Sequence, residues 1–322
     1  MAGGRRKVVA VAAGLAALAA LNWAAARASR RRRYANARLG RLESRWYGVR
    51  GLRLHALASA ELPGVELAGA EPAGHGLLPV VLVHGLGVSS RYMVPIARHL
   101  AADFPVYAPD LPGFGWSDKP RHALTIRQLA DALADWMEAA GLERAVLLGN
   151  SMGCEILVEL ALRHPERVAA LVLQGPTPEP AARTAAQQLW RYAVTGQYER
   201  SPLSWISLSD YLVCGVRRLV RTFRYMLEDR IEDKLPLVRQ PCLVVRGTRD
   251  RIVSQEWASE VARLLPDGRL AVIPGAAHAI NFSYPWEFRR AIMPFLLAGS
   301  AQAPSVSTGA PLGRGRVLAG SA

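Results

Sequence analysis

The sequence predicts an α/β fold, with a mostly parallel, twisted sheet and helices on both of its faces. Short apolar runs alternate with longer stretches of helical periodicity along most of the chain, as they do in successive βαβ units. The chain has 322 residues, 51% of them hydrophobic, which is enough to bury the core of one large domain. Residues 177–240 interrupt the alternation, so the sequence also predicts a helical insertion in that domain.

The predicted strands are short and apolar, as expected for strands that are covered on both faces. The first is a strand or hairpin over residues 46–57, followed by a connection rich in Gly, Pro and Ala over residues 58–78. The remaining strands are expected at residues 79–84, 106–108, 145–148, 168–173, 243–245 and 270–273.

Helical patterns separate these strands. The clearest begins at Thr125, places Leu129, Leu133 and Trp136 on one face, and ends before Gly141. The other helices are expected at residues 92–102, 155–163, 257–265 and 286–297.

The insertion, residues 177–240, contains no clear strand. Seven of the chain's 23 aromatic residues fall within residues 181–240. This concentration predicts an apolar face that covers another part of the molecule. It divides the main domain into a first part, residues 46–176, and a second part, residues 241–298.

The positive charge of the chain lies at its ends. The net charge is +14 at pH 7, yet residues 51–300 contain 26 basic and 25 acidic side chains. A nearly neutral body argues against nucleic acid as a partner. The three cysteines, Cys154, Cys214 and Cys242, have neither a disulfide-framework nor a zinc-site spacing, so we expect buried thiols, no metal and no cofactor.

Residues 1–45 form a hydrophobic segment and a basic linker. The uncharged run 8–26 has 19 residues, about the length that spans a bilayer core, although ten of them are alanine. Because five arginines follow the run closely, the positive-inside rule predicts a membrane anchor with the folded domain in the cytoplasm. A secretory signal cleaved after Ala24–Ala26, a helix on the membrane surface and a soluble appendage are the alternatives. At the other end, residues 299–322 are predicted to be a disordered tail.

Gly149-Asn-Ser-Met-Gly153 lies between a predicted strand and a predicted helix. Such a G-x-S-x-G turn leaves its serine at the apex, beside the free N–H groups of the following helix. Ser151 is therefore the candidate nucleophile. A serine hydroxyl needs a histidine to accept its proton, and the histidine needs a carboxylate to orient it.

The order of the motifs resembles the α/β-hydrolase family over about residues 46–298. The resemblance implies that Asp250, in Gly247-Thr-Arg-Asp250, is the acid and that His278, in Gly275-Ala-Ala-His278, is the base. It also implies that the insertion forms a helical cap over the nucleophile. Cys154 departs from the family pattern, in which a small glycine or alanine is commoner at that position.

His84-Gly-Leu-Gly87 resembles the family's oxyanion loop. The resemblance implies that the oxyanion hole consists of the N–H groups of Leu86 and Met152, with Gly87 as the alternative to Leu86. His84 is then structural, as is Asp110, which heads a fold-marking loop of the family.

Six aromatic side chains of the insertion would line the roof of an apolar substrate pocket: Trp190, Tyr192, Trp205, Tyr211, Phe223 and Tyr225. We expect Phe114, Trp116 and Phe282 to contribute from the main domain. An alternative is that the aromatic side chains of the insertion only pack its helices together. Arg217, Arg221 and Arg224 share a helix face, which is either solvated or binds a substrate carboxylate or lipid headgroups.

The serine nucleophile separates the chain from the family's epoxide hydrolases and haloalkane dehalogenases, which use aspartate. The elbow also resembles that of serine C–C hydrolases, but these commonly carry tryptophan after the histidine, where this chain has Ala279. We therefore expect hydrolysis of carboxylic esters of small to medium apolar or aromatic substrates through an acyl-enzyme. The alternatives are C–C hydrolysis of meta-cleavage products, cofactor-free haloperoxidase-like chemistry, amide or lactone hydrolysis, and a membrane-tethered binding scaffold without activity.

Overall fold

A computed structural model describes residues 42–59, 77–199 and 201–300. Its strands are β1 (Leu42–Val49), β2 (Leu52–Ser59), β3 (Val80–Val83), β4 (Val106–Pro109), β5 (Ala145–Asn150), β6 (Val168–Gln174), β7 (Cys242–Gly247) and β8 (Gly268–Ile273). Its α-helices are α2 (Ser90–Leu100), α3 (Ile126–Ala139), α4 (Met152–Arg163), α5 (Ala185–Gly196), α6 (Ser201–Cys214), α7 (Val216–Glu228), α8 (Ile231–Lys234), α9 (Gln255–Leu264), α10 (Ile280–Ser283) and α11 (Pro285–Ser300). Three 3₁₀ turns are η1 (Pro165–Arg167), η2 (Pro180–Ala182) and η3 (Leu235–Leu237).

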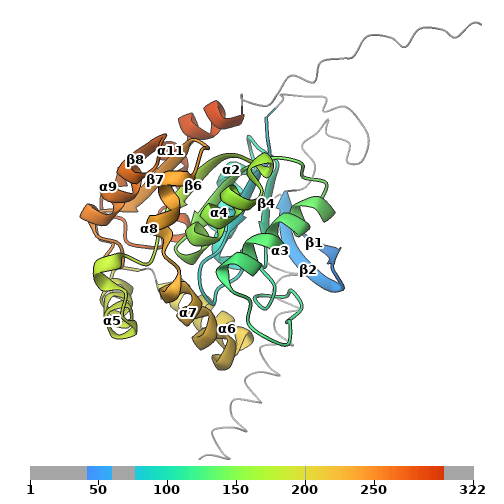
Figure 1. The fold of residues 1–322 in the computed structure, drawn as a ribbon, viewed down its shortest axis with the longest axis horizontal. Coiled ribbons are helices and arrows are strands. Elements are labelled where there is room, and N and C mark those ends of the chain that lie inside the picture. Colours follow the sequence, from blue (N-terminus) through green and yellow to red (C-terminus); the bar gives the residue numbers. More distant parts are fainter. Residues whose placement is uncertain (1–41, 60–76, 200, 301–322) are drawn as a thin grey trace, which may run out of the picture.

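The strands form one eight-stranded sheet in the order β1-β2-β4-β3-β5-β6-β7-β8 (Figure 1). The hairpin β1–β2 is antiparallel and joins the sheet by antiparallel pairing of β2 with β4. All other pairs are parallel. The predicted α/β class, with a mostly parallel sheet, is therefore confirmed.

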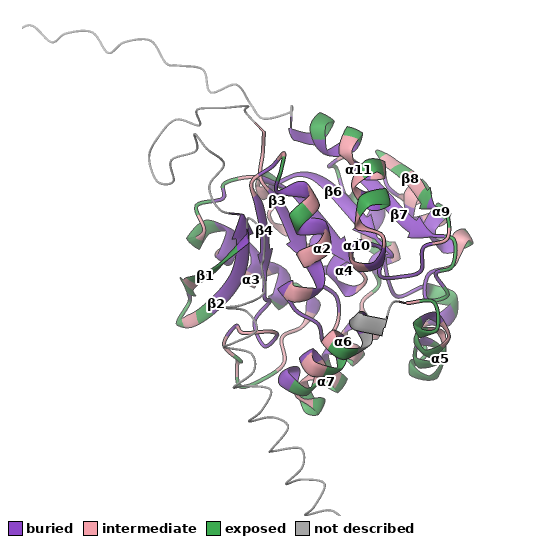
Figure 2. Cartoon of the chain, turned by 180° about the vertical axis from the view of Figure 1, so that it is seen from behind, coloured by how far each residue is buried: buried purple, intermediate pink, exposed green. Residues whose placement is uncertain are grey.

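Alternate residues of the central strands enter two separate cores. In β3, Val81 and Val83 pack in the core with α3, α4 and α9, whereas Val80 and Leu82 pack in the core with α2 and α11. Figures 1 and 2 show these two helical layers from opposite sides of the sheet. Covering both faces requires apolar residues at every position of the strand, which is why the run 80–83 does not alternate with polar residues.

Local signals set the ends of the helices. The Thr125 hydroxyl accepts a hydrogen bond from the Gln128 N–H (3.3 Å), and the Gln128 side chain accepts one from the Thr125 N–H (3.0 Å). This capping box satisfies backbone donors of the first turn and begins α3 where the sequence predicts it.

Only helices lie between β6 and β7 in the described residues of the insertion: η2, α5, α6, α7, α8 and η3. Figure 1 shows α5, α6 and α7 together at the lower end of the sheet, and Figure 2 shows that α5 is largely exposed.

The predicted anchor run 8–26 lies outside the described residues, as do residues 301–322 of the predicted tail. The last residues of the predicted linker, 42–45, belong to β1, and the first two of the predicted tail, Gly299 and Ser300, belong to α11. Within the described ranges, no helix is long and apolar enough to cross a membrane.

Candidate active site

Ser151 sits at a strained turn between β5 and α4. It has φ +55° and ψ −122°, and its N–H donates to the Gln174 carbonyl of the neighbouring strand (2.9 Å). The turn also needs its two glycines, because a side chain at Gly149 would come within 2.7 Å of the Gly153 backbone, and one at Gly153 within 2.6 Å of the Val83 oxygen. The backbone thus holds the serine outside the regular geometry of both elements, a conformation that costs about 1–3 kcal/mol.

Asp250 and His278 meet beyond the ends of β7 and β8. The His278 Nδ1–H donates to Asp250 Oδ2 over 2.7 Å, and the carboxyl group is buried. Asp250 Oδ1 in turn accepts hydrogen bonds from the N–H groups of Ile252 (2.8 Å) and Val253 (3.1 Å). These bonds orient the imidazole so that Nε2 is the nitrogen left to accept a proton.

The charge of Asp250 changes the basicity of the histidine. Burial alone would lower the pKa of His278, but the charge and hydrogen bond of Asp250 outweigh it. Together with a contribution from Glu199, they raise the pKa above its ordinary value of 6.5. Within the described residues, His278 Nε2 has no hydrogen-bond partner, so it is available to a hydroxyl or a substrate atom.

The candidate oxyanion loop runs beside Ser151. A side chain at Gly85 would lie 3.3 Å from Ser151 Cβ, which places the following residue, Leu86, next to the serine. Met152 is the first residue of α4, and the first N–H groups of a helix have no partner within the helix. His84 is fully buried and bridges this loop to its neighbour: its Nδ1 pairs with the Gly85 oxygen (2.8 Å), and its Nε2 accepts from the Leu111 N–H (3.1 Å).

Asp110 holds the loop that follows β4. Its buried carboxylate pairs with His55 Nδ1 (2.8 Å) and accepts from the N–H groups of Ser90 (2.6 Å) and Trp116 (2.8 Å). None of these partners is a candidate catalytic residue. Asp110 therefore has a structural role, in which it links β2, β4 and α2.

The predicted pocket residues lie in different surroundings. Phe114 is buried against His84, Trp116 packs on His55, and Phe282 stacks on Tyr92. Trp190 and Trp205 are 71% and 75% exposed. None of the described contacts brings these two tryptophans together with Ser151.

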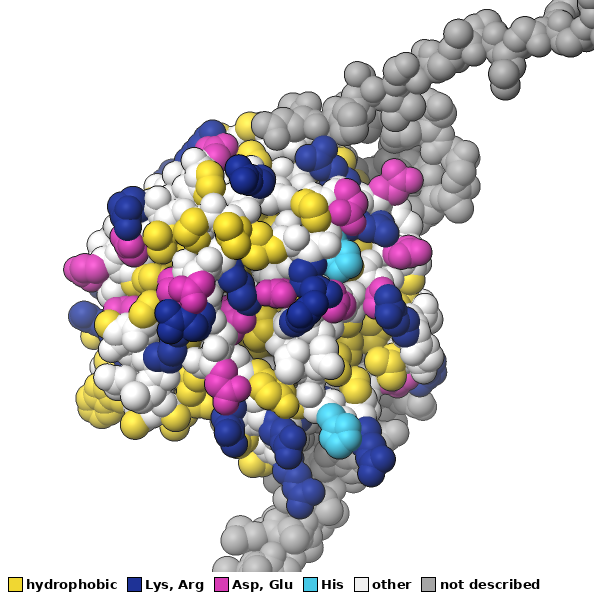
Figure 3. Space-filling view, in the orientation of Figure 1, with side chains coloured by type: hydrophobic (Ala, Val, Ile, Leu, Met, Phe, Trp, Pro, Cys, Tyr) yellow, Lys and Arg dark blue, Asp and Glu magenta, His cyan; other side chains and the backbone are white. Residues whose placement is uncertain are grey.

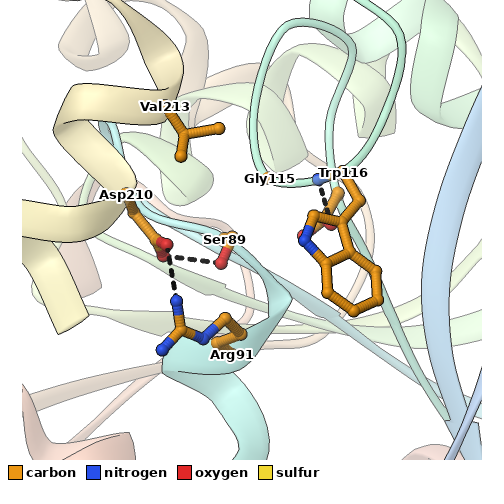
Figure 4. Close-up of a pocket in the computed structure, with 7 residues that line it drawn as sticks. Ser89, Arg91, Gly115, Trp116, Asp210 and Val213 are labelled. Carbon is orange, nitrogen blue, oxygen red and sulfur yellow. Dashed lines mark hydrogen bonds and ion pairs between the residues drawn. The ribbon is translucent and has the colours of Figure 1, made fainter. Parts of the chain in front are cut away.

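Figure 4 shows where Trp116 does lie. It borders a small hollow in which Asp210 of α6 accepts a hydrogen bond from the Ser89 hydroxyl (2.6 Å) and pairs with Arg91 (3.2 Å). Ser89 comes two residues after the candidate oxyanion loop. At this hollow the insertion is therefore bonded to the main domain. None of Ser151, Asp250 and His278 is among the residues that line it.

Three residues near Ser151 and His278 were not predicted from the sequence. The Thr177 hydroxyl is 3.3 Å from the Ser151 hydroxyl, and Gln174 Nε2 donates to the His278 carbonyl (2.9 Å). Glu199 accepts a hydrogen bond from the N–H that follows His278. Gln174 and Thr177 lie at and after the carboxyl end of β6, a position that could have indicated them. No sequence signal marks Glu199.

No cluster of side chains suited to a metal ion occurs in the described ranges 42–59, 77–199 and 201–300.

Comparisons with known proteins show which chains this one resembles. The family model for the alpha/beta hydrolase fold matches residues 79–203. A pimeloyl-[acyl-carrier protein] methyl ester esterase from Edwardsiella ictaluri is 27% identical over 250 residues, 69% of this chain and 94% of that protein. A 2-(acetamidomethylene)succinate hydrolase from Mesorhizobium japonicum is 28% identical over 242 residues, 67% and 87% of the two chains.

Among solved structures, a bacterial membrane phospholipase A superposes with a TM-score of 0.65 at 25% identity, covering 93% of this chain and 98% of that one. An esterase from Thermogutta terrifontis superposes with a TM-score of 0.60 at 23% identity, covering 80% and 99%, which shows a shared fold. The eight-stranded sheet, the turn that presents Ser151 and these similarities show that the chain has the α/β-hydrolase fold.

Proposed function

We propose that the protein is a serine hydrolase that cleaves carboxylic esters of small to medium apolar or aromatic substrates. The observation that carries the proposal is the 2.7 Å bond between His278 Nδ1 and Asp250, which leaves Nε2 open, in a fold that presents Ser151 at a strained turn. The similar esterase from E. ictaluri supports an ester substrate.

In the proposed mechanism, His278 Nε2 takes the proton of Ser151 as Oγ attacks the ester carbonyl. The N–H groups of Leu86 and Met152 would stabilise the oxyanion, with Gly87 as the alternative to Leu86. His278 then gives the proton to the departing alcohol, which leaves an acyl-Ser151 intermediate. A water molecule, deprotonated by the same imidazole, releases the carboxylic acid and restores the serine.

Substitution of the three residues tests this proposal. Ser151→Ala should lower kcat for p-nitrophenyl esters by about 10³–10⁶-fold, His278→Ala should be similar, and the losses should not multiply, because the residues act as one unit. Asp250→Asn should cost as much or less. Purified, folded Ser151→Ala protein that keeps wild-type turnover would exclude the mechanism. Faster turnover of a 2-hydroxy-6-oxo-dienoate than of any ester would instead identify a C–C hydrolase.

We also propose that the protein is associated with a membrane, through the uncharged run 8–26 and its flanking arginines. The surface of the insertion supports this. Nine of the fourteen exposed large hydrophobic side chains of the described residues lie between residues 185 and 228. Arg217, Arg221 and Arg224 are exposed on α7 in the same segment. In Figure 3, hydrophobic side chains gather over α5 at the lower left and basic ones along the lower edge. This combination suits an interface with anionic lipid.

A further inference from the structure

The insertion contacts the loop that carries His278 through Glu199, which lies between α5 and α6. One carboxylate oxygen accepts a hydrogen bond from the Ala279 N–H (2.7 Å), and the other accepts one from the Ser283 hydroxyl (3.0 Å). On the other side of the same loop, Gln174 Nε2 holds the His278 carbonyl (2.9 Å). The peptide group that follows the histidine is thus held at both of its polar atoms, the His278 carbonyl by the sheet and the Ala279 N–H by the insertion.

The helix that precedes Glu199 is fastened to the loop that carries Asp250. Arg191 of α5 donates to the Ile252 carbonyl (3.0 Å), and Thr195 Oγ1 accepts from the Arg251 N–H (3.3 Å). Arg191 also pairs with Glu179, whose carboxylate accepts from the Ser254 N–H (3.2 Å). Therefore α5 and Glu199 together connect the insertion to both the acid loop and the base loop.

Glu199 also acts through its charge. Its carboxylate contributes to the raised pKa of His278, after the larger effects of burial and of Asp250. Tyr92 of α2 lies near both carboxylates, but burial raises its pKa well above its ordinary value, so it stays neutral. Arg246 is directed to the main chain, where it donates to the Asp250 carbonyl (2.9 Å). Asp250 and Glu199 are therefore the charged groups that set the basicity of the histidine.

We propose that Glu199 is a positioning residue for His278: it fixes the base loop to the insertion, and its negative charge stabilises the imidazolium that forms during catalysis. The inference rests on the proposed function, because it assumes that His278 is the base. It means that displacement of the insertion would weaken the base itself.

The test is the pH dependence of kcat/KM for p-nitrophenyl butyrate in the full chain, comparing wild type with Glu199→Gln, Glu199→Ala and Ser283→Ala. A base works only when neutral, so activity falls as the pH drops below its pKa. Glu199→Gln removes the charge and should move this acidic limb to lower pH. Glu199→Ala should move it likewise and lower kcat by about tenfold, since the loop also loses its anchor. Ser283→Ala is the matched control: it removes one hydrogen bond to Glu199, keeps the charge and should leave the limb in place.

The rate at which a fluorophosphonate labels Ser151 at each pH gives a second readout that needs no substrate. An unmoved acidic limb in folded Glu199→Gln protein, by both readouts, would overturn the role of Glu199. If Ser151→Ala and His278→Ala are inactive at the same time, the proposed function stands and only this inference fails. Wild-type turnover in Ser151→Ala would refute the proposed function instead.

Discussion

Glu155 follows Ser151 by four residues, in the first turn of α4, and its carboxyl group is fully buried. Neither oxygen has a hydrogen-bond partner of normal geometry among the described residues, although the Thr177 side chain lies near enough to favour the charged form. Burial dominates and, with the nearby Asp229, raises the pKa of Glu155 well above its ordinary value of 4.5. Burial therefore favours the protonated, neutral form of this carboxyl group, four residues from Ser151.

This residue should make stability depend on pH in a defined direction. The folded chain holds the Glu155 proton to higher pH than the unfolded chain, in which the carboxyl group ionises above pH 4.5. The unfolded state then binds fewer protons, so the contribution of Glu155 is full below that pH and is lost as the pH rises toward the folded pKa. Glu155→Gln, which cannot ionise, should remove this loss. Its Tm, relative to wild type, should be higher at pH 8 than at pH 5.

Thermal unfolding of both proteins over this pH range measures the effect, and Glu256→Gln, at an exposed position of α9, is the control. A constant Tm difference between Glu155→Gln and wild type would show that Glu155 is already ionised in the folded state.

Prediction from sequence works for single residues that belong to a motif. Ser151, Asp250 and His278 each follow a strand in a recognisable local pattern, and the structure joins the last two by a hydrogen bond. Glu199 belongs to no pattern, because its position depends on how the insertion packs against the loop that carries His278. Such tertiary contacts cannot be derived from local spacing.

At the scale of elements, the insertion approaches the candidate oxyanion loop through α6 and α7. A side chain at Gly87 would meet Tyr211 at 2.6 Å and Leu219 at 2.7 Å. The exposed Trp190 and Trp205 have no such contact. Of the six aromatic residues predicted for the pocket roof, the geometry thus favours Tyr211, together with Leu219, over Trp190 and Trp205 as the side chains that limit the acyl group.

A panel of acetyl, butyryl, octanoyl and benzoyl esters separates the two pairs. The double variant Tyr211→Ala/Leu219→Ala should raise kcat/KM for the octanoyl ester relative to the acetyl ester by about tenfold, a usual effect of changing an apolar pocket by a few methylene groups. Trp190→Ala/Trp205→Ala, the matched control, should leave the ranking unchanged. If instead Trp190→Ala/Trp205→Ala changes the ranking and Tyr211→Ala/Leu219→Ala does not, the two tryptophans determine the selectivity.

The strands and helices of the main domain can be predicted from the sequence because each has a distinct hydrophobic pattern. Each central strand is buried on both faces, as in the run Val80–Val83, and each helix has one apolar side. The hairpin β1–β2 was predicted with shorter limits than it has. Its outer strand, Leu42–Val49, alternates buried and exposed residues only weakly, since it lies at the edge of the sheet. Edge strands lack the continuous apolar run that identifies central ones.

At the scale of the whole molecule, membrane association predicts how the full chain fractionates. It should pellet with membranes and stay there after a carbonate wash. A chain beginning near Arg38 should be soluble and keep its esterase activity, because the residues of the candidate site all lie beyond the removed segment. Recovery of the full chain in the soluble fraction would contradict the anchor. A mature N-terminus near residue 27 or 29 would show a cleaved signal instead.

Covalent labelling of Ser151 tests the central claim most directly. The full-length protein is treated with a fluorophosphonate, digested and analysed by peptide mass spectrometry. We predict one label on the peptide that contains Ser151, slow labelling in His278→Ala and none in Ser151→Ala. The label requires a serine made nucleophilic by its base, so it reports the mechanism without knowledge of the substrate. Folded wild-type protein that stays unlabelled, or carries the label on another serine, would contradict the account.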